Sequence, residues 1–249
     1  MDRRTFLKTV PAFTVLAATG YSFAQDTARA SKPGEAAGPA PTTSPDLEAI
    51  TLPKPQTDGG KSVLAALRER KTIRDISPEN LSPQMLSNLL WAAWGVNREN
   101  GPSGQPGRTA ASASNAQEID LYVVLPEGAY LYDAVPHRLT PVVAGDLRAK
   151  VGRGRRGSAA QAPVNLIFVA DIAKYAKARF QEPGLKDPEI QKSYYNVATG
   201  LIAGNVFLFA ASQGLAAWFH NCDKAGLAAE LKLRPEQRVL YAQTVGYPA

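Results

Sequence analysis

The spacing of apolar residues predicts five helices along the chain. The segment of residues 190–213 is the longest and is apolar on nearly every side, which is typical of a buried helix. In the first two helices a serine, Ser62 or Ser82, stands where a helix N-cap is expected, and Pro83 suits the first helical position. The predicted helices span residues 62–70, 83–94, 171–181, 190–213 and 224–231.

Alternating and β-branched runs predict strands among these helices. Residues 164–170 are apolar almost without interruption, as in a central strand that is covered on both faces. Residues 97–117 are polar and rich in Gly, Pro, Ser and Ala, and a loop of this length is usually functional or disordered. The predicted strands span residues 118–124, 130–132, 164–170, 215–221 and 238–245.

The N-terminus has the three parts of a cleavable export signal. A charged start with Arg3 and Arg4 precedes an apolar run over residues 10–18, and a small-x-small pattern ends at Ala24. The paired arginines and the Thr-Phe-Leu-Lys that follows them resemble the twin-arginine signal, with an ordinary secretory signal as the alternative. We therefore expect a signal peptide over residues 1–24, export by the twin-arginine route, and a periplasmic or secreted protein.

The residues after the signal peptide are rich in Ala, Pro, Gly, Ser and Thr and lack a hydrophobic period. This composition predicts a flexible, disordered linker over residues 25–60, in which residues 47–52 are the first candidates for an ordered piece. The folded domain is expected over residues 61–249.

Composition excludes several kinds of site. The net charge of +6 is modest and partly carried by the leader, and basic residues do not alternate with aromatic ones, so we expect no nucleic-acid partner. One cysteine excludes an internal disulfide, and two histidines argue against a zinc cage. Of these histidines, His137 has only Asp133 near it in sequence, which favours a structural role.

The basic segment of residues 68–74 has the sequence Arg-Glu-Arg-Lys-Thr-Ile-Arg. Arg70, Thr72 and Arg74 could converge on one phosphate group, because guanidinium forks match phosphate oxygens and a hydroxyl adds a hydrogen bond. The alternative is a solvated basic helix end, which the helix dipole would also favour.

The polar loop ends in a cluster of amide and hydroxyl groups. Ser112, Asn115 and Gln117 offer both hydrogen-bond donors and acceptors among small residues, which suits the edge of a flat heterocycle such as a flavin. The alternative is a surface loop whose polar side chains only cap turns.

Two further features have open interpretations. Gly200 and Gly204 allow close helix approach, which indicates a core or dimer seam; polar residues in this helix argue against a membrane span.

The glycine-rich run with Arg153, Arg155 and Arg156 predicts an exposed basic loop, with an anionic substrate contact as the alternative.

Five segments together resemble the FMN-dependent nitroreductase family over residues 62–248. The segments are Arg70-Lys71-Thr72-Ile73-Arg74, the Ser112-x-x-Asn115-x-Gln117 pattern, Gly200 to Asn205, Gly214-Leu215-Ala216 and Gly246-Tyr247-Pro248. Ala216 stands where the family has a glycine that admits close approach of the flavin.

The resemblance implies an α+β fold with three α-β-α layers, a central mixed or antiparallel sheet and an intertwined homodimer. FMN would lie at the subunit interface and carry the chemistry, so no catalytic side chain is assigned. Its phosphate would be held by Arg70, Lys71, Thr72 and Arg74, and its ring would contact Ser112, Asn115, Gln117 and Ala216.

The resemblance also implies a ping-pong transfer of hydride or electrons to or from a small organic substrate. Nitro compounds, quinones and heterocycles fit, and relatives that oxidise peptide azolines make oxidation as reasonable as reduction. NAD(P)H is the usual donor, but an exported protein would meet little of it. The alternatives are an exported flavin-binding protein without turnover and a flavin-free dimeric scaffold.

Overall fold

The computed structural model describes residues 47–101, 104–152 and 158–249. The predicted signal peptide, residues 25–46 of the predicted linker, and Arg153, Arg155 and Arg156 of the basic loop lie outside the described residues.

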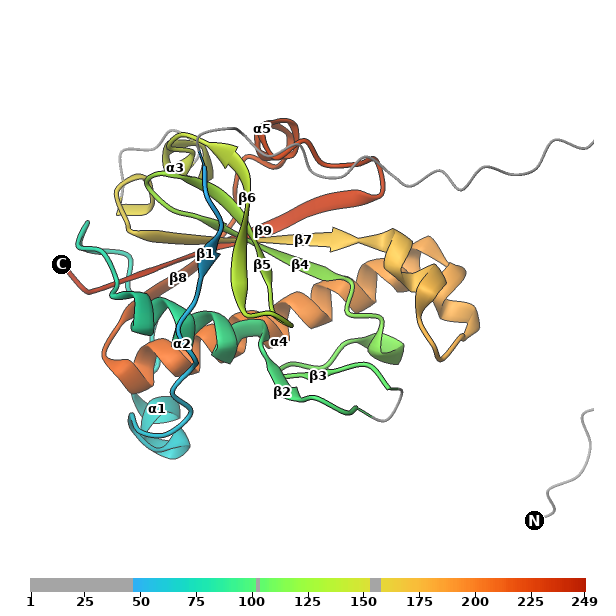
Figure 1. The fold of residues 1–249 in the computed structure, drawn as a ribbon, viewed down its shortest axis with the longest axis horizontal. Helices are drawn as coiled ribbons and strands as arrows, with labels where there is room; N and C mark the ends of the chain where they lie inside the picture. The colour runs from blue at the N-terminus through green and yellow to red at the C-terminus, as the bar shows by residue number, and fades with distance from the viewer. Residues whose placement is uncertain (1–46, 102–103, 153–157) are drawn as a thin grey trace, which may run out of the picture. The chain divides into compact units, whose positions relative to one another are not determined.

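The described strands form a seven-stranded antiparallel sheet in the order β1-β6-β5-β4-β7-β9-β8, and a separate two-stranded ribbon pairs β2 with β3 (Figure 1). All eight residues of β7 are buried, and β7 pairs with both β4 and β9, so the prediction of a central strand is confirmed. The strands are β1 (Ile50–Thr51), β2 (Val96–Arg98), β3 (Gly107–Arg108), β4 (Ile119–Val124), β5 (Gly128–Asp133), β6 (Arg138–Ala144), β7 (Val164–Asp171), β8 (Ala216–His220) and β9 (Gln237–Gly246).

Helices cover both faces of the sheet and make three layers, as expected (Figure 1). One buried cluster joins the sheet to α2 and α4, and a second joins its other face to α3 and α5. The expected caps are present, because Ser62 Oγ and Ser82 Oγ each accept a backbone N–H of the first turn. The α-helices are α1 (Val63–Glu69), α2 (Pro83–Trp94), α3 (Arg148–Val151), α4 (Pro188–Gln213) and α5 (Lys224–Glu230).

Several elements differ from the sequence-based predictions, and two of them are informative. The α-helix expected over residues 171–181 is wrong: the 3₁₀ helix η3 (Ile172–Lys177) lies there, and a second 3₁₀ helix, η4 (Pro183–Lys186), follows it. The stretch before Pro183 is short, and a single 3₁₀ segment suffices to bury Tyr175. Strand β6 was not predicted, because Pro141 weakens a strand pattern; the proline lies where the β5–β6 register shifts, a position that tolerates it.

The fold begins inside the segment that was expected to be a linker. Ile50 pairs with Leu139 of β6, and Leu47 and Leu52 are buried. Residues 47–52 are therefore ordered, as expected, and ordered structure starts before residue 60.

Two helices expose apolar side chains that the sequence pattern assigned to buried faces. On α1, Leu64 is 79% exposed and only Ala66 is buried. On α4, Val197 is 62% exposed and Leu201 is 45% exposed, so this face is not buried within the described chain, where a core or a dimer seam was expected. By length and composition α4 could cross a membrane, a property that buried core helices share.

His137 links the β5–β6 turn to α2. Its Nε2 lies 2.7 Å from Ser87 Oγ and its Nδ1 lies 2.9 Å from the Tyr132 hydroxyl. Because Ser87 donates its own proton to the Pro53 carbonyl, Nε2–H is the donor to Ser87, and Nδ1 accepts from Tyr132. Burial lowers the pKa of His137, which favours the neutral imidazole with a hydrogen bond at each ring nitrogen. The expected structural role fits this geometry.

Candidate functional site

The basic segment after α1 runs along the outer edge of the sheet. Ile73 N–H donates to the Ala217 carbonyl at 3.1 Å, which pins the segment to the edge strand β8. The Arg70 guanidinium lies 5.3 Å from the ring centroid of Phe207 on α4, and that of Arg74 lies 5.8 Å from the ring centroid of Trp218 on β8. The two guanidinium groups therefore rest on rings of different elements.

A cavity of about 430 Å³ lies between this segment, α1 and the C-terminal part of α4. Lys61, Arg68 and Lys71 contribute positive charge to its lining. Glu69 contributes a negative charge there and pairs with both Lys61 and Arg68. Its apolar lining comes from Ile73, Phe207, Ala210, Ala211, Leu215 and Ala217, together with Gly214. Of the four predicted phosphate residues, Lys71 lines this cavity. Arg70, Thr72 and Arg74 do not line it and are exposed beside it on the same segment.

The Gly214 turn brings β8 to the cavity. Gly214 ends α4 in the left-handed conformation at φ 72°, which glycine adopts without strain, and Leu215 N–H donates to the Ala210 carbonyl. Because side chains alternate along a strand, Ala217 lines the cavity while Ala216 packs on the other side against Ile76 and Ala162. The methyl group of Ala216 therefore does not enter the cavity.

The second predicted group lies in a strained loop around the 3₁₀ turn η1 (Ala113–Asn115). Ser114, Asn115 and Gln117 have positive φ angles of 50°, 51° and 50°. Non-glycine residues in this region cost on the order of 1–3 kcal/mol each and cluster at functional sites. The Ser112 hydroxyl accepts the Gln117 N–H at 2.9 Å, and the Lys174 ammonium donates to the Gln117 carbonyl at 3.1 Å. These contacts hold the loop in its strained shape.

Both ends of the Gln117 side chain are engaged within the chain. Its Oε1 accepts from Arg108 Nε at 2.7 Å, and its Nε2 donates to the Pro106 carbonyl at 2.8 Å and to Asn115 Oδ1 at 3.1 Å. Gln117 therefore braces Asn115. Sequence reasoning placed Arg108 in the loop but gave it no role, because the pattern holds no signal for the distant contacts that this arginine makes.

The cavity and the loop lie on different sides of α4. The Asn205 side chain donates to the Thr109 carbonyl at 3.2 Å, whereas Phe207 lines the cavity. Residues two positions apart on a helix are separated by roughly 200° around its axis. Figure 1 shows that they also lie at different positions along the helix, with α1 near one end of α4 and the β2–β3 ribbon farther along it. Within one chain, the two predicted groups of residues are thus not brought together.

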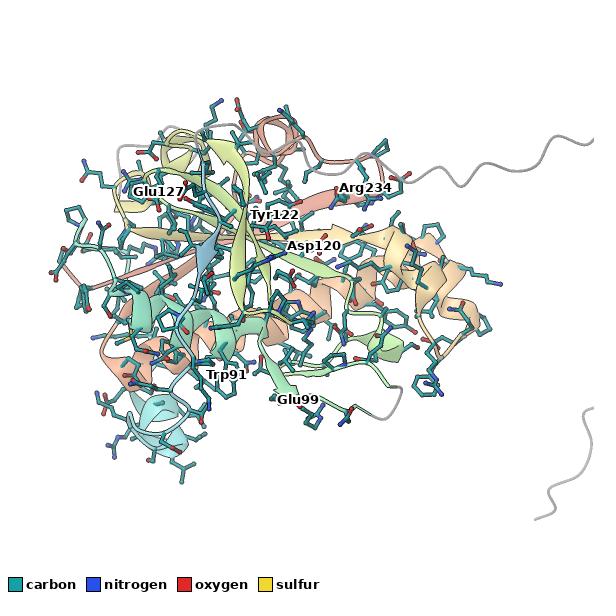
Figure 2. All side chains as sticks on the ribbon, in the orientation of Figure 1. Trp91, Glu99, Asp120, Tyr122, Glu127 and Arg234 are labelled. Atoms are coloured by element: carbon teal, nitrogen blue, oxygen red, sulfur yellow. The ribbon has the colours of Figure 1, made fainter. Side chains whose placement is uncertain are left out.

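Glu118 follows the loop directly and is fully buried. Among the described residues, neither of its carboxyl oxygens has a hydrogen-bond partner. Burial raises the pKa of Glu118, while the nearby Tyr175 hydroxyl and Lys174 ammonium oppose the rise only in part. Lys174 is occupied by Asp120, which Figure 2 labels beside Tyr122 on β4. The Glu118 carboxyl therefore keeps its proton to a higher pH than an exposed glutamate does.

The Glu118 carboxyl predicts a specific pH dependence of stability. Its pKa is raised in the folded state, so its favourable contribution is complete below the unfolded pKa of about 4.3 and is lost as pH rises through the folded pKa. We expect the free energy of unfolding of Glu118→Gln, measured relative to that of the natural protein, to increase as the pH rises above about 4.3. Urea unfolding of both proteins across this range measures the difference in the free energy of unfolding. A difference that does not change with pH would contradict the raised pKa of Glu118.

Comparison with known proteins supports the sequence resemblance. The profile of the Nitroreductase family matches residues 67–247. A crystal structure of a candidate nitroreductase from Ralstonia eutropha JMP134 has a TM-score of 0.71 and 32% identity, and the match covers 88% of this chain and 98% of that chain. A candidate nitroreductase of Methanocaldococcus jannaschii is 25% identical over 179 residues, which cover 69% of this chain and 78% of that protein.

One further solved structure has a similar fold at lower identity. The Escherichia coli microcin synthetase McbBCD complex, with truncated pro-MccB17 bound, gives a TM-score of 0.60 at 16% identity, covering 82% of this chain and 79% of that chain. The family profile and the Ralstonia structure cover most of the described region, and the chain belongs to the nitroreductase family of oxidoreductases.

Proposed function

We propose that the protein is an FMN-dependent oxidoreductase. The observation that carries this proposal is the cavity of about 430 Å³, whose cationic side chains stand beside the apolar turn at Gly214 and Leu215. A phosphate tail and a flat ring require this combination of charge and apolar surface. Family membership supports the redox class, since flavin dependence is typical of nitroreductases.

The residues present fit FMN in two respects. Lys71 at the cavity, with Arg70, Thr72 and Arg74 on the same segment, offers charge-assisted hydrogen bonds to a phosphate. At the loop, the buried Thr109 hydroxyl has no partner among the described residues, and such a group needs one. Bound FMN would supply reversible transfer of hydride or electrons, while the chain positions the ring and excludes water from it.

A homodimer would resolve the separation of the cavity and the loop. The exposed apolar residues Leu64, Val197 and Leu201 lie on α1 and α4, the two helices that flank the cavity. An added Cβ at Gly200 or Gly204 would meet no heavy atom of the described chain within 4 Å, so a second helix could approach closely there. We propose that a second copy covers this surface and contributes its Ser112–Gln117 loop to the cavity of its partner.

The proposed reaction is a ping-pong transfer between a donor and a small organic acceptor. Nitro compounds, quinones and heterocycles are the substrate classes that we propose, in either direction of electron flow. The twin-arginine-like leader supports export to the periplasm or beyond. There NAD(P)H is a doubtful donor, so a different reductant is the better candidate.

Anaerobic reduction and reoxidation of the purified full-length protein tests this function. After the bound flavin is bleached with a chemical reductant, we expect a nitroaromatic or a quinone to restore its visible absorbance without oxygen. A flavin that stays reduced with every acceptor would indicate a flavin-binding protein without turnover. A colourless protein that takes up no added FMN would indicate the flavin-free scaffold.

A further inference from the structure

Arg108 is a partly buried arginine that the proposed function does not yet use. It lies on β3, and its guanidinium carbon sits 5.3 Å from the ring centroid of Trp94. Nη1 donates to the Trp94 carbonyl at 3.2 Å, and Nε donates to Gln117 Oε1 at 2.7 Å. The guanidinium group is therefore fixed on both sides, with one arm on the strained loop.

The charge of Arg108 is not neutralised locally. None of the ion pairs among the described residues includes it. Burial lowers the pKa of Arg108, and Tyr132, Asp133 and Asp120 counter this effect only from a distance. A partly desolvated cation without a counter-ion is costly to the fold, and such groups mark functional sites.

A hydrogen-bonded relay connects this cation to the outer part of the loop. Arg108 Nε–H points to Gln117 Oε1, and Gln117 Nε2–H points to Asn115 Oδ1. Each donor faces the next acceptor, so the amide dipoles are aligned with their positive ends away from Arg108. Hydrogen bonds in such a chain polarise one another, and a cation at its start strengthens the effect.

We propose that Arg108 is a positioning residue that acts through Gln117 and Asn115 to favour the reduced state of a flavin bound at this loop. The inference rests on the proposed function. Electron density that enters the ring on reduction is stabilised by nearby positive charge and by donors aimed at the ring edge. Bracing alone would not explain the residue, because a neutral donor could hold the Gln117 amide without the cost of a partly buried charge.

The midpoint potential of the bound flavin tests this proposal, because a purely structural role would not move it. We expect Arg108→Gln to lower the potential by about 30 mV, which corresponds to a tenfold weaker preference for the reduced state in a two-electron couple. Arg108→Lys keeps the charge but loses the planar fork, so its potential should lie between the two. The matched control is Arg98→Gln on the neighbouring strand β2, where the arginine is exposed; it should keep the natural potential.

Potentials are measured by equilibration of the purified full-length protein with redox dyes, and circular dichroism confirms folding. A folded, flavin-loaded Arg108→Gln protein with the natural potential would overturn the inference while leaving the proposed function intact. If that variant does not fold, the midpoint potential of the flavin in Asn115→Ala is measured instead. A lowered potential supports the relay, and an unchanged potential overturns it. If the natural protein binds no flavin, the proposed function and this inference both fail.

Discussion

Gly204→Arg is expected to convert the protein from a dimer to a monomer and to abolish flavin retention. An added Cβ at residue 204 meets no heavy atom within 4 Å in the described chain. Glycine is about 0.8–1.0 kcal/mol less favourable than alanine in a helix, whereas arginine is among the good helix formers. The folded protomer should therefore be no less stable. In the proposed dimer, however, a large charged residue would separate the two helices that meet at this glycine, and the proposed contacts of FMN with the partner's loop would be lost.

Size-exclusion chromatography with light scattering and the flavin content of the same peak provide the readout. Gly152→Arg is the matched control, because this glycine is remote from α4 in the fold and an added Cβ makes only ordinary contacts of 3.6 Å or more. A Gly204→Arg protein that remains dimeric and yellow would place the interface elsewhere. If the natural protein is itself a monomer, the proposed homodimer is wrong.

Arg74→Ala is expected to weaken FMN binding by about ten- to a hundredfold. Charge-assisted hydrogen bonds contribute about 1.5–3 kcal/mol each, and 1.4 kcal/mol is a factor of ten in affinity. The Arg74 guanidinium carbon lies 5.8 Å from the Trp218 ring centroid, on the same segment as Lys71 of the cavity.

The dissociation constant can be measured by titration of flavin-stripped protein, with flavin fluorescence as the signal. Arg138→Ala is the control, since this arginine is exposed on β6 and pairs with Asp133 away from the cavity. Equal losses of FMN affinity in the two variants would mean that Arg74 contributes only through its net charge and makes no direct contact with the phosphate. The assignment of Arg74 to the phosphate would then be wrong.

The sequence predicted those parts of the fold that depend on local rules. Ser62 and Ser82 cap their helices, and the apolar run at residues 164–170 became the buried centre of the sheet. Strand β6 could not be read in the same way, because Pro141 argues against a strand until its partner β5 is known. The exposed Val197 shows a related limit, since an apolar position does not say whether its own chain or a partner covers it.

The candidate site was predictable in its residue types but not in its geometry. Local sequence placed Lys71 and Gly214 in separate motifs, and the fold joins them around one cavity. The loop motif was expected to present Gln117 to a ring, whereas the structure engages both ends of its amide with Arg108, Pro106 and Asn115. A contact such as that of Arg108 with the Trp94 carbonyl depends on the β2–β3 ribbon, which the polar composition of the loop did not indicate.

Parallel titrations of the flavin-stripped protein with FMN and with riboflavin test the central claim most directly, because the two ligands differ only in the phosphate. We expect saturation at one FMN per chain and an affinity for FMN at least tenfold higher than that for riboflavin, since the difference must come from the cations near Lys71. Equal affinities for the two ligands, or no binding of FMN, would contradict it.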